Sequence, residues 1–352
     1  MPKEILSPKE RWLAVLNREK PDRIPMDYWA TDETTERLIN HLECENKFEM
    51  FQKLHIDKVI KLEPKYIGPA LPAGYDVFGC QHQDMNYGTG IYDECISHPL
   101  ADYHVVEEIK NNYIWPDPDW WDYSSVKRQI KGKEMYPVEG GNYEPFLIYK
   151  DLRGPEKAFM DLVENPEMVH FCLDQLFDLI FTQIKRIYEQ IPGQIMLTYV
   201  AEDMGAQEDL MISPSHIQEF LLPNMKKIID FVHQQGAFVF HHNDGCISRV
   251  IPDLIEAGID ILNPIQWRCK HMGRDRLKGD FGDKIIFHGA MDNQQTLPFG
   301  STKDVKKEVL ENLKILGKGG GYILAPCHNL QPNTPIENIL TMYETGFESG
   351  WT

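Results

Sequence analysis

The feature that most constrains the fold is a regular alternation of short apolar runs with longer amphipathic segments, which begins near residue 133. Strands are predicted at 135–138, 195–201, 237–240, 260–265, 284–288 and 321–325. Segments of ten or more residues with helical periodicity separate most of them. Parallel neighbours need crossovers of that length, so the alternation predicts a parallel sheet. About seven or eight such units, with no Gly-x-Gly-x-x-Gly after the first strand, favour a single (β/α)8 TIM barrel over a doubly wound sheet.

Capping residues mark where the helices of this α/β chain begin. Ser7 and Glu10 form a capping box that opens an N-terminal helical lead-in over 7–43. Later helices are predicted after the starts Gly154-Pro155, Asn165-Pro166, Ser213-Pro214, Ile247, Ser301 and Thr334-Pro335. Residues 74–103 are rich in glycine and aromatic residues and are interpreted as a hairpin or lid insertion. No linker is evident, so residues 1–352 are predicted to form one barrel domain.

Composition excludes several classes of partner. The formal net charge is −18, which argues against nucleic acid or an anionic membrane, because both need clustered cations. No apolar run is long enough to span a bilayer. The first residues are charged and lack the apolar core of a signal peptide, and the seven cysteines are scattered without a paired framework. We therefore expect a cytoplasmic protein with reduced thiols.

Titratable side chains cluster directly after the predicted strands. Reading only those positions collects Glu202, Asp203, His241, His242, Asn243, Asp244, Cys246, Gln266, Trp267, His288, Asp292, Cys327 and His328. In a barrel the carboxyl ends of all strands open on one face, where catalytic residues are found. Carboxylates, imidazoles and a thiol on one rim predict a metal site or an acid–base site.

The pair His242-x-Asp244 is the most specific candidate within this set. On an extended segment alternate side chains point the same way, so both can reach one ion. Cys327 could add sulfur and Glu202 a fourth oxygen, and zinc accepts nitrogen, oxygen and sulfur ligands in a tetrahedral arrangement. The alternative is that His242 and Asp244 hydrogen-bond to loop backbone while Cys327 is an inert buried thiol.

Other candidates each have a structural alternative. Glu202 and Asp203 could form an acid–base pair in which one carboxyl has a raised pKa, or they could anchor a loop or a helix end. His288 is interpreted as a satisfied core histidine. The aromatic residues of the insertion, Tyr75, Phe78, Tyr87 and Tyr92, would suit either a wall over a flat ligand or the small core of a hairpin.

Five segments stand out along the chain: SPKERWLAVLNREKPDRIPMDYWA, AEDMGAQEDLMISP, FHHNDGCISRVIPDLIEAGIDILNPIQ, FHGAMDNQQTLPFG and GGGYILAPCHNLQPNTPIENILTMYE. In this order they resemble the uroporphyrinogen decarboxylase superfamily over nearly the whole chain. The resemblance implies a (β/α)8 barrel, in agreement with the alternation. True decarboxylases of the tetrapyrrole carry an Arg-rich N-terminal segment, whereas the corresponding stretch here has only Arg23 as a basic residue. A substrate with eight carboxylates needs a cationic pocket, so tetrapyrrole decarboxylation is disfavoured.

The chain is also similar to the corrinoid-dependent methyltransferase branch of this superfamily. The thiol-methylating members bind zinc through a His-x-Cys pair and a later Cys. His242 and Cys327 fall on two of those positions, and Asp244 stands where the middle Cys would be. An oxygen ligand makes the site harder and disfavours thiol methylation. The resemblance then implies an O-demethylase methyltransferase that takes a methyl group from a methyl ether.

This prediction assigns zinc to His242, Cys327 and one or both of Asp244 and Glu202, with Asp203 or Glu202 as a proton donor. The methyl acceptor would be the cob(I)alamin (cobalamin) of a corrinoid protein that docks transiently. Which small-molecule methyl donor is used is left open. The alternatives are a metal-free uroporphyrinogen decarboxylase-like decarboxylase (a carboxy-lyase) and a non-enzymatic tetrapyrrole-binding barrel.

Overall fold

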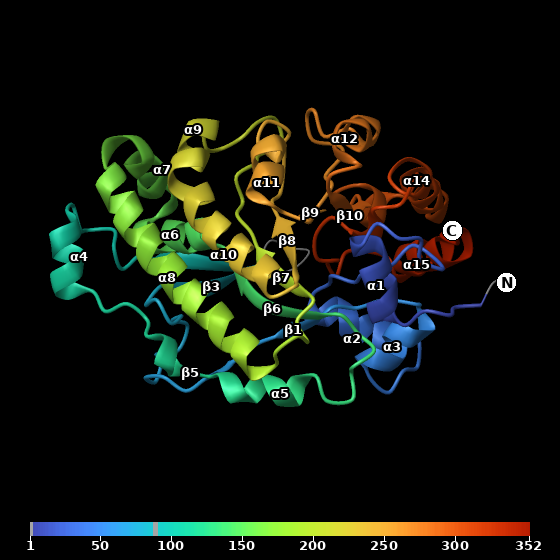
Figure 1. Cartoon of the computed structure of the whole chain (residues 1–352), viewed down its shortest axis with the longest axis horizontal. Helices are drawn as coiled ribbons and strands as arrows, with labels where there is room; N and C mark the ends of the chain where they lie inside the picture. Colours follow the sequence, from blue (N-terminus) through green and yellow to red (C-terminus); the bar gives the residue numbers. More distant parts are fainter. Residues whose placement is uncertain (1–2, 87–90) are drawn as a thin grey trace.

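A curved sheet of seven parallel strands forms the centre of the molecule in a computed structural model that describes residues 3–86 and 91–352 (Figure 1). The strands are β1 (Ile60–Leu62), β6 (Val138–Tyr143), β7 (Leu197–Val200), β8 (Phe238–His242), β9 (Ile261–Asn263), β10 (Ile286–Met291) and β11 (Tyr322–Pro326). They pair in this order, each with the next along the chain. Right-handed crossovers between adjacent parallel strands produce this order in TIM-barrel-like folds. The predicted α/β class is therefore confirmed.

Helices provide the crossovers and lie outside the sheet. Figure 1 shows α8, α10 and α11 along one side, and α12, α14 and α15 along the other. After β6 come α6 (Pro145–Arg153), α7 (Pro155–Glu164) and α8 (Pro166–Gln190); after β7 come α9 (Pro214–His216), the π-helical η3 (Ile217–Leu221) and α10 (Leu222–Gln234). The remainder are α11 (Ile251–Ala257), α12 (Arg274–Phe281), α13 (Thr296–Phe299), α14 (Thr302–Ile315) and α15 (Ile336–Ser349).

The predicted caps are mostly confirmed. Ser7 and Glu10 form the capping box of α1 (Pro8–Leu16), and Ser301 opens α14 in the same way. The N-terminal segment continues through α2 (Asp32–His41) and α3 (Lys47–Lys53). Two predicted starts are wrong. α11 begins at Ile251 and not at Ile247, because residues 248–250 form a turn before it. Pro335 and not Thr334 is the N-cap of α15, and no side chain accepts a cap hydrogen bond there.

An eighth strand is predicted, but the main sheet of the described residues has seven. Residues 25–27 lie between its two edge strands instead. Leu324 N donates to Pro25 O at 2.9 Å, and Asp27 N donates to Leu324 O at 2.9 Å. On the other side Asp57 N donates to Met26 O at 2.7 Å. Backbone hydrogen bonds of this short segment therefore connect β11 to the residues that lead into β1.

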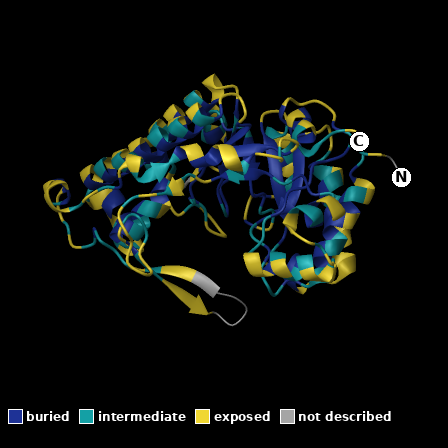
Figure 2. Cartoon of the chain, turned by 90° about the horizontal axis from the view of Figure 1, so that it is seen from below, coloured by how far each residue is buried: buried dark blue, intermediate teal, exposed yellow. Residues whose placement is uncertain are grey.

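The 74–103 insertion contains the predicted hairpin. Its strands β3 (Gln81–Asn86) and β4 (Ile91–Ser97) pair antiparallel, and Figure 2 shows them standing out from the body with exposed residues along β3. Phe78 packs against the main core, whereas the predicted ring contacts of Tyr87 and Tyr92 lie outside the described residues. A role for the hairpin as a lid stays a prediction.

Between the hairpin and β6 the chain forms α4 (Val106–Asn112), η1 (Pro118–Trp120), β5 (Trp121–Asp122), η2 (Tyr123–Ser125) and α5 (Val126–Gln129), and β5 pairs with β2 (Lys65–Tyr66).

Alternation along the strands separates two cores. Residues of one parity face the helices, and residues of the other parity fill the space enclosed by the sheet. The inner cluster takes Leu197, Tyr199, Phe240, Ile261, Ile286 and Ile323 from the strands, with Trp12 of α1 packed against them. Two residues beyond Phe240, Ile261 and Ile286 come His242, Asn263 and His288, so the same parity directs polar side chains inward nearer the carboxyl ends.

Three predicted strand boundaries are corrected. β8 continues to His242, so His241 and His242 lie within the strand and not after it. β6 begins at Val138, so residues 135–137 precede the strand rather than forming it. β10 continues to Met291, which places His288 in the middle of the strand and not at its end. Among the described residues, no helix combines the length and apolar character needed to cross a bilayer.

Candidate metal centre

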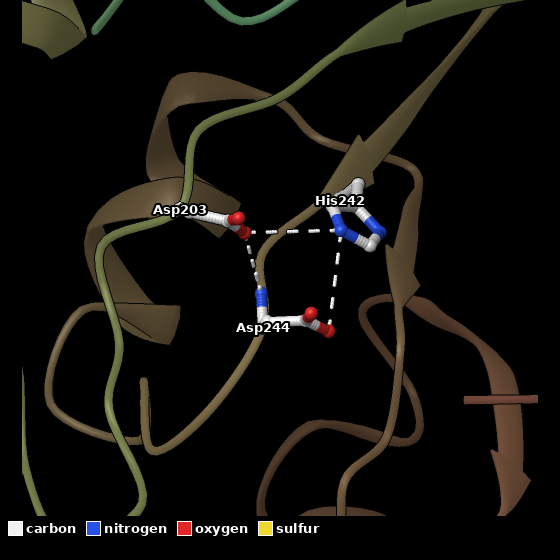
Figure 3. A group of neighbouring side chains, drawn as sticks. All are labelled: Asp203, His242 and Asp244. Carbon is white, nitrogen blue, oxygen red and sulfur yellow. Dashed lines mark hydrogen bonds and ion pairs between the residues drawn. The ribbon is translucent and has the colours of Figure 1, made fainter. Parts of the chain in front are cut away.

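Asp203, His242 and Asp244 converge at the carboxyl ends of β7 and β8 (Figure 3). Each offers one ligand atom, and these atoms all lie within 4.8 Å of one another. His242 Nε2 is 3.8 Å from Asp203 Oδ1 and 4.0 Å from Asp244 Oδ1. The imidazole is 5% exposed, whereas the two carboxylates are 30% and 29% exposed. The group therefore combines a buried imidazole with two aspartate side chains that are partly exposed.

Backbone contact between two loops holds the carboxylates together. Asp244 N donates to Asp203 Oδ1 at 3.1 Å, and Cys246 N donates to Ala206 O at 2.7 Å. The contact requires two glycines: a Cβ on Gly205 would lie 2.4 Å from Asp244 O, and a Cβ on Gly245 would lie 2.7 Å from Ala206 O. Gly245 also has a φ of +85°, which L side chains rarely adopt.

The Gly205→Ala substitution is expected to weaken metal binding, because the methyl group forces the loop that carries Asp244 away from Asp203. We expect zinc affinity to fall about tenfold, the scale of effect seen for residues that orient metal ligands, as measured by competition with a chromophoric chelator. The matched control is Gly279→Ala in α12, where a Cβ meets nothing within 4 Å. If both variants bind zinc equally tightly, the close approach of the loops does not shape the site.

The donor set fits a divalent cation. Burial raises the pKa of Asp244, and Asp203 adds to this effect while His242 opposes it. Asp244 Oδ1 is buried and has no hydrogen-bond partner among the described residues. Zinc ligands at ~2.1 Å in a tetrahedral arrangement are ~3.4 Å apart, closer than the 3.8 and 4.0 Å that separate His242 Nε2 from the two carboxylates. A cation would give Asp244 Oδ1 a partner and would draw the three ligand atoms closer together.

Two predicted ligands lie outside this group. Cys327 is buried, and its Sγ donates to Ile265 O at 3.4 Å; burial raises the pKa of its thiol well above the usual value. Glu202 is fully buried, and both of its oxygens lie 2.9 Å from Phe146 N in the first turn of α6. Burial also raises the pKa of Glu202 well above its ordinary value. Glu202 thus anchors a helix end, and ligation by Cys327 or Glu202 stays a prediction.

Aromatic rings from outside the insertion flank His242. Trp29 and Tyr199 stack on the imidazole with centroid separations of 5.7 and 5.8 Å. Lys61 Nζ lies 4.8 Å from the centroid of the Trp29 ring and 5.1 Å from that of Tyr199. Tyr199 could have been found from its inward parity in β7. Trp29 follows no predicted strand, so reading strand ends alone misses it.

The fold and this group together define an α/β barrel-like protein with a histidine–carboxylate centre at the carboxyl ends of neighbouring strands. That is where barrel enzymes carry their catalytic groups.

The chain belongs to the uroporphyrinogen decarboxylase (URO-D) family, whose profile matches residues 124–348. A uroporphyrinogen decarboxylase of Pseudomonas entomophila is 26% identical over 61% of this chain and 59% of its own length. One from Thermus thermophilus is 24% identical over 59% of this chain and 54% of its own length. The chain therefore spans less than two thirds of these curated relatives. The predicted family is confirmed.

A solved methyltransferase from Methanosarcina mazei has the same fold. It superposes with a TM-score of 0.67 over 97% of this chain and 99% of its own, at 19% sequence identity. Because the sequence identity is low, this similarity establishes the shared barrel-like fold alone.

Proposed function

We propose that this protein is a zinc-dependent methyltransferase that moves a methyl group from a methyl ether to the cob(I)alamin of a corrinoid protein. The observation that carries the proposal is the convergence of His242 Nε2 with the carboxylates of Asp203 and Asp244 at the strand ends. The similarity in fold to a methyltransferase supports it. Oxygen ligands favour an oxygen-bearing substrate over a thiol.

In this proposal His242, Asp203 and Asp244 hold the ion, and Cys327 is a further candidate ligand after local movement. Zinc, when bound, supplies Lewis acidity toward a leaving oxygen. In the transfer the methyl carbon loses its bond to the ether oxygen and gains a bond to cobalt, which contributes the electron pair. The oxygen departs with the electrons of the broken bond and takes up one proton. The predicted donors are Asp203 and Glu202, and burial raises the pKa of Glu202 well above its ordinary value, which favours its protonated form.

A decarboxylase acting on a tetrapyrrole is the second candidate, favoured by the names of the curated relatives. The charges near the site argue against it. Arg23, the basic residue of the N-terminal segment, is buried and bonds to Asp57 and Glu4. In addition to burial, the charge of Asp203 raises the pKa values of Glu144, Glu202 and Asp244, and the charge of Glu144 raises that of Glu202. A region so rich in acids is poorly suited to a substrate with many carboxylates.

The first test is the metal content of the protein purified without a His-tag or chelators, followed by methyl transfer from methoxylated aromatics to cob(I)alamin. We expect one zinc ion per chain and consumption of cob(I)alamin.

Asp203→Asn should reduce zinc content, and Cys327→Ser should do so only if the thiol ligates. Cys44→Ser, at a half-buried cysteine away from the site, is the matched control. A protein that neither contains nor takes up metal, yet decarboxylates a tetrapyrrole, would be the decarboxylase. Tetrapyrrole binding without turnover would indicate the non-enzymatic barrel.

A further inference from the structure

Three successive strands place polar side chains in one layer inside the sheet. His242 of β8, Asn263 of β9 and His288 of β10 are all buried, and each follows an inward apolar residue by two positions. Asp27, in the segment that connects the sheet edges, is buried beside them. The proposed function uses only His242 from this layer. Buried polar groups are costly unless they are fully hydrogen-bonded, so the bonding of the other three needs an explanation.

The four side chains form one continuous hydrogen-bonded chain. His242 Nδ1 lies 2.6 Å from Asn263 Oδ1, and Asn263 Nδ2 lies 2.7 Å from His288 Nδ1. His288 Nε2 lies 3.2 Å from Asp27 Oδ2. Asp27 Oδ2 also accepts from Trp29 Nε1 at 2.8 Å, and Lys58 Nζ is 3.5 Å from Asp27 Oδ1.

Asp27 determines the direction of every bond in this chain. Burial acts to raise the pKa of Asp27, but the charge of Lys58 and the bond from His288 outweigh it and hold the pKa well below the ordinary value. An ionised carboxylate can only accept, so His288 Nε2 carries a proton. Burial lowers the pKa of His288, so the ring is neutral and its Nδ1 accepts from the Asn263 amide. Asn263 Oδ1 must then accept from Nδ1–H of His242.

We propose that Asp27, His288 and Asn263 are positioning residues that hold His242 in the tautomer protonated on Nδ1, with the lone pair of Nε2 directed at Asp203 and Asp244. The proposal rests on the proposed function only in taking a cation as the ligand of this lone pair. It accounts for the separations of 3.8 and 4.0 Å between Nε2 and the carboxylates. A protonated Nε2 would form hydrogen bonds of ~2.7–3.2 Å there.

The arrangement distinguishes a metal site from an acid–base pair. A histidine acting as a base or acid with these carboxylates needs a proton on the nitrogen that faces them. Here the hydrogen-bonded chain stabilises the tautomer that has no proton on Nε2. In that tautomer Nε2 of His242 and the carboxylates of Asp203 and Asp244 all direct lone pairs at one point. Outer partners of this kind fix the orientation of metal-binding histidines and raise their basicity. The layer is therefore preorganised for a cation.

The test is the tautomer of His242 in metal-free protein, read from ¹⁵N shifts of selectively labelled histidines and assigned by the signal lost in His242→Gln. We expect Nδ1–H in the wild type. Asn263→Leu removes both bonds, so it should give a mixture of tautomers and zinc binding about 10–100-fold weaker. Asn263→Asp keeps an acceptor for His242 Nδ1 and should retain both the tautomer and most of the affinity. Ile261→Val, one layer below on the same strand, is the packing control and should change neither.

The outcomes separate the inference from the proposed function. Protonation of Nε2 in the wild type, or an unchanged tautomer in Asn263→Leu, overturns the inference whether or not zinc binds. If Asn263→Leu does not fold, loss of the tautomer in Asn263→Asp overturns it equally. A third outcome is that Nδ1 is protonated and depends on Asn263, but the protein takes up no zinc. The positioning role then stands, and the proposed metal-dependent function is overturned.

Discussion

Replacement of His242 by alanine is expected to lower zinc affinity by at least about 100-fold, or about 2.7 kcal/mol, and to abolish methyl transfer. His242 supplies the one nitrogen of the candidate centre and is its only buried member. Without it two partly exposed carboxylates remain, and these repel each other and favour hydrated cations over zinc. Competition with a chelator of known affinity measures the first effect, and consumption of cob(I)alamin measures the second.

The control for this variant is His170→Ala. His170 lies on α8, is about half exposed and contacts Glu219, so its removal should leave zinc content and turnover unchanged. Loss of His242 also leaves Asn263 Oδ1 without its partner, so urea unfolding should accompany the zinc measurement to separate destabilisation from loss of a ligand. A His242→Ala protein that keeps both its metal and full activity would contradict the assignment of the centre.

Periodicity in the sequence predicts the order of the strands and where most of them end. This suffices to place Asp203, His242 and Asp244 on one rim, because the carboxyl ends of adjacent parallel strands meet on one face. Asp203 is predicted there as a proton donor, whereas its carboxylate lies in the candidate metal centre. Periodicity does not predict where the side chain of Glu202 lies. Its neighbour Asp203 faces the centre, whereas Glu202 turns to the start of α6, a helix that the sequence analysis did not predict.

The buried layer of His242, Asn263 and His288 could be predicted from the sequence only in part. Alternation alone places His242, Asn263 and His288 on the inner side of their strands. That Asn263 lies opposite His242 depends on the register of β8 with β9, and that Asp27 reaches His288 depends on how residues 25–27 connect the sheet edges. These are long-range pairings with no local signal. His288 is interpreted from sequence as a satisfied core histidine, and its two hydrogen bonds agree with that interpretation.

The Asp57→Ala substitution is expected to lower the free energy of unfolding by about 3–5 kcal/mol, the usual cost of removing one partner from a buried ion-pair network. Asp57 accepts from Arg11 Nη1 at 2.5 Å and from Arg23 Nη1 at 2.8 Å, and all three side chains are 1% exposed. It also accepts from Met26 N at 3.0 Å. One carboxylate thus connects α1 to the segment that closes the sheet, and its loss leaves buried donors without acceptors.

Urea unfolding gives the measurement, provided that the dependence on urea is the same for both proteins. Asp57→Asn keeps an acceptor oxygen but no charge, so it should lose less stability than Asp57→Ala. The surface comparison is Asp119→Ala: Asp119 is 77% exposed in its pair with Arg186, and such pairs contribute about 0–1 kcal/mol. Equal effects of Asp57→Ala and Asp119→Ala would mean that the remaining partners of the arginines, Asp22 and Glu4, satisfy them without Asp57. The segment of residues 25–27 would then be held by its backbone hydrogen bonds and by the contacts of Asp27 with His288 and Lys58.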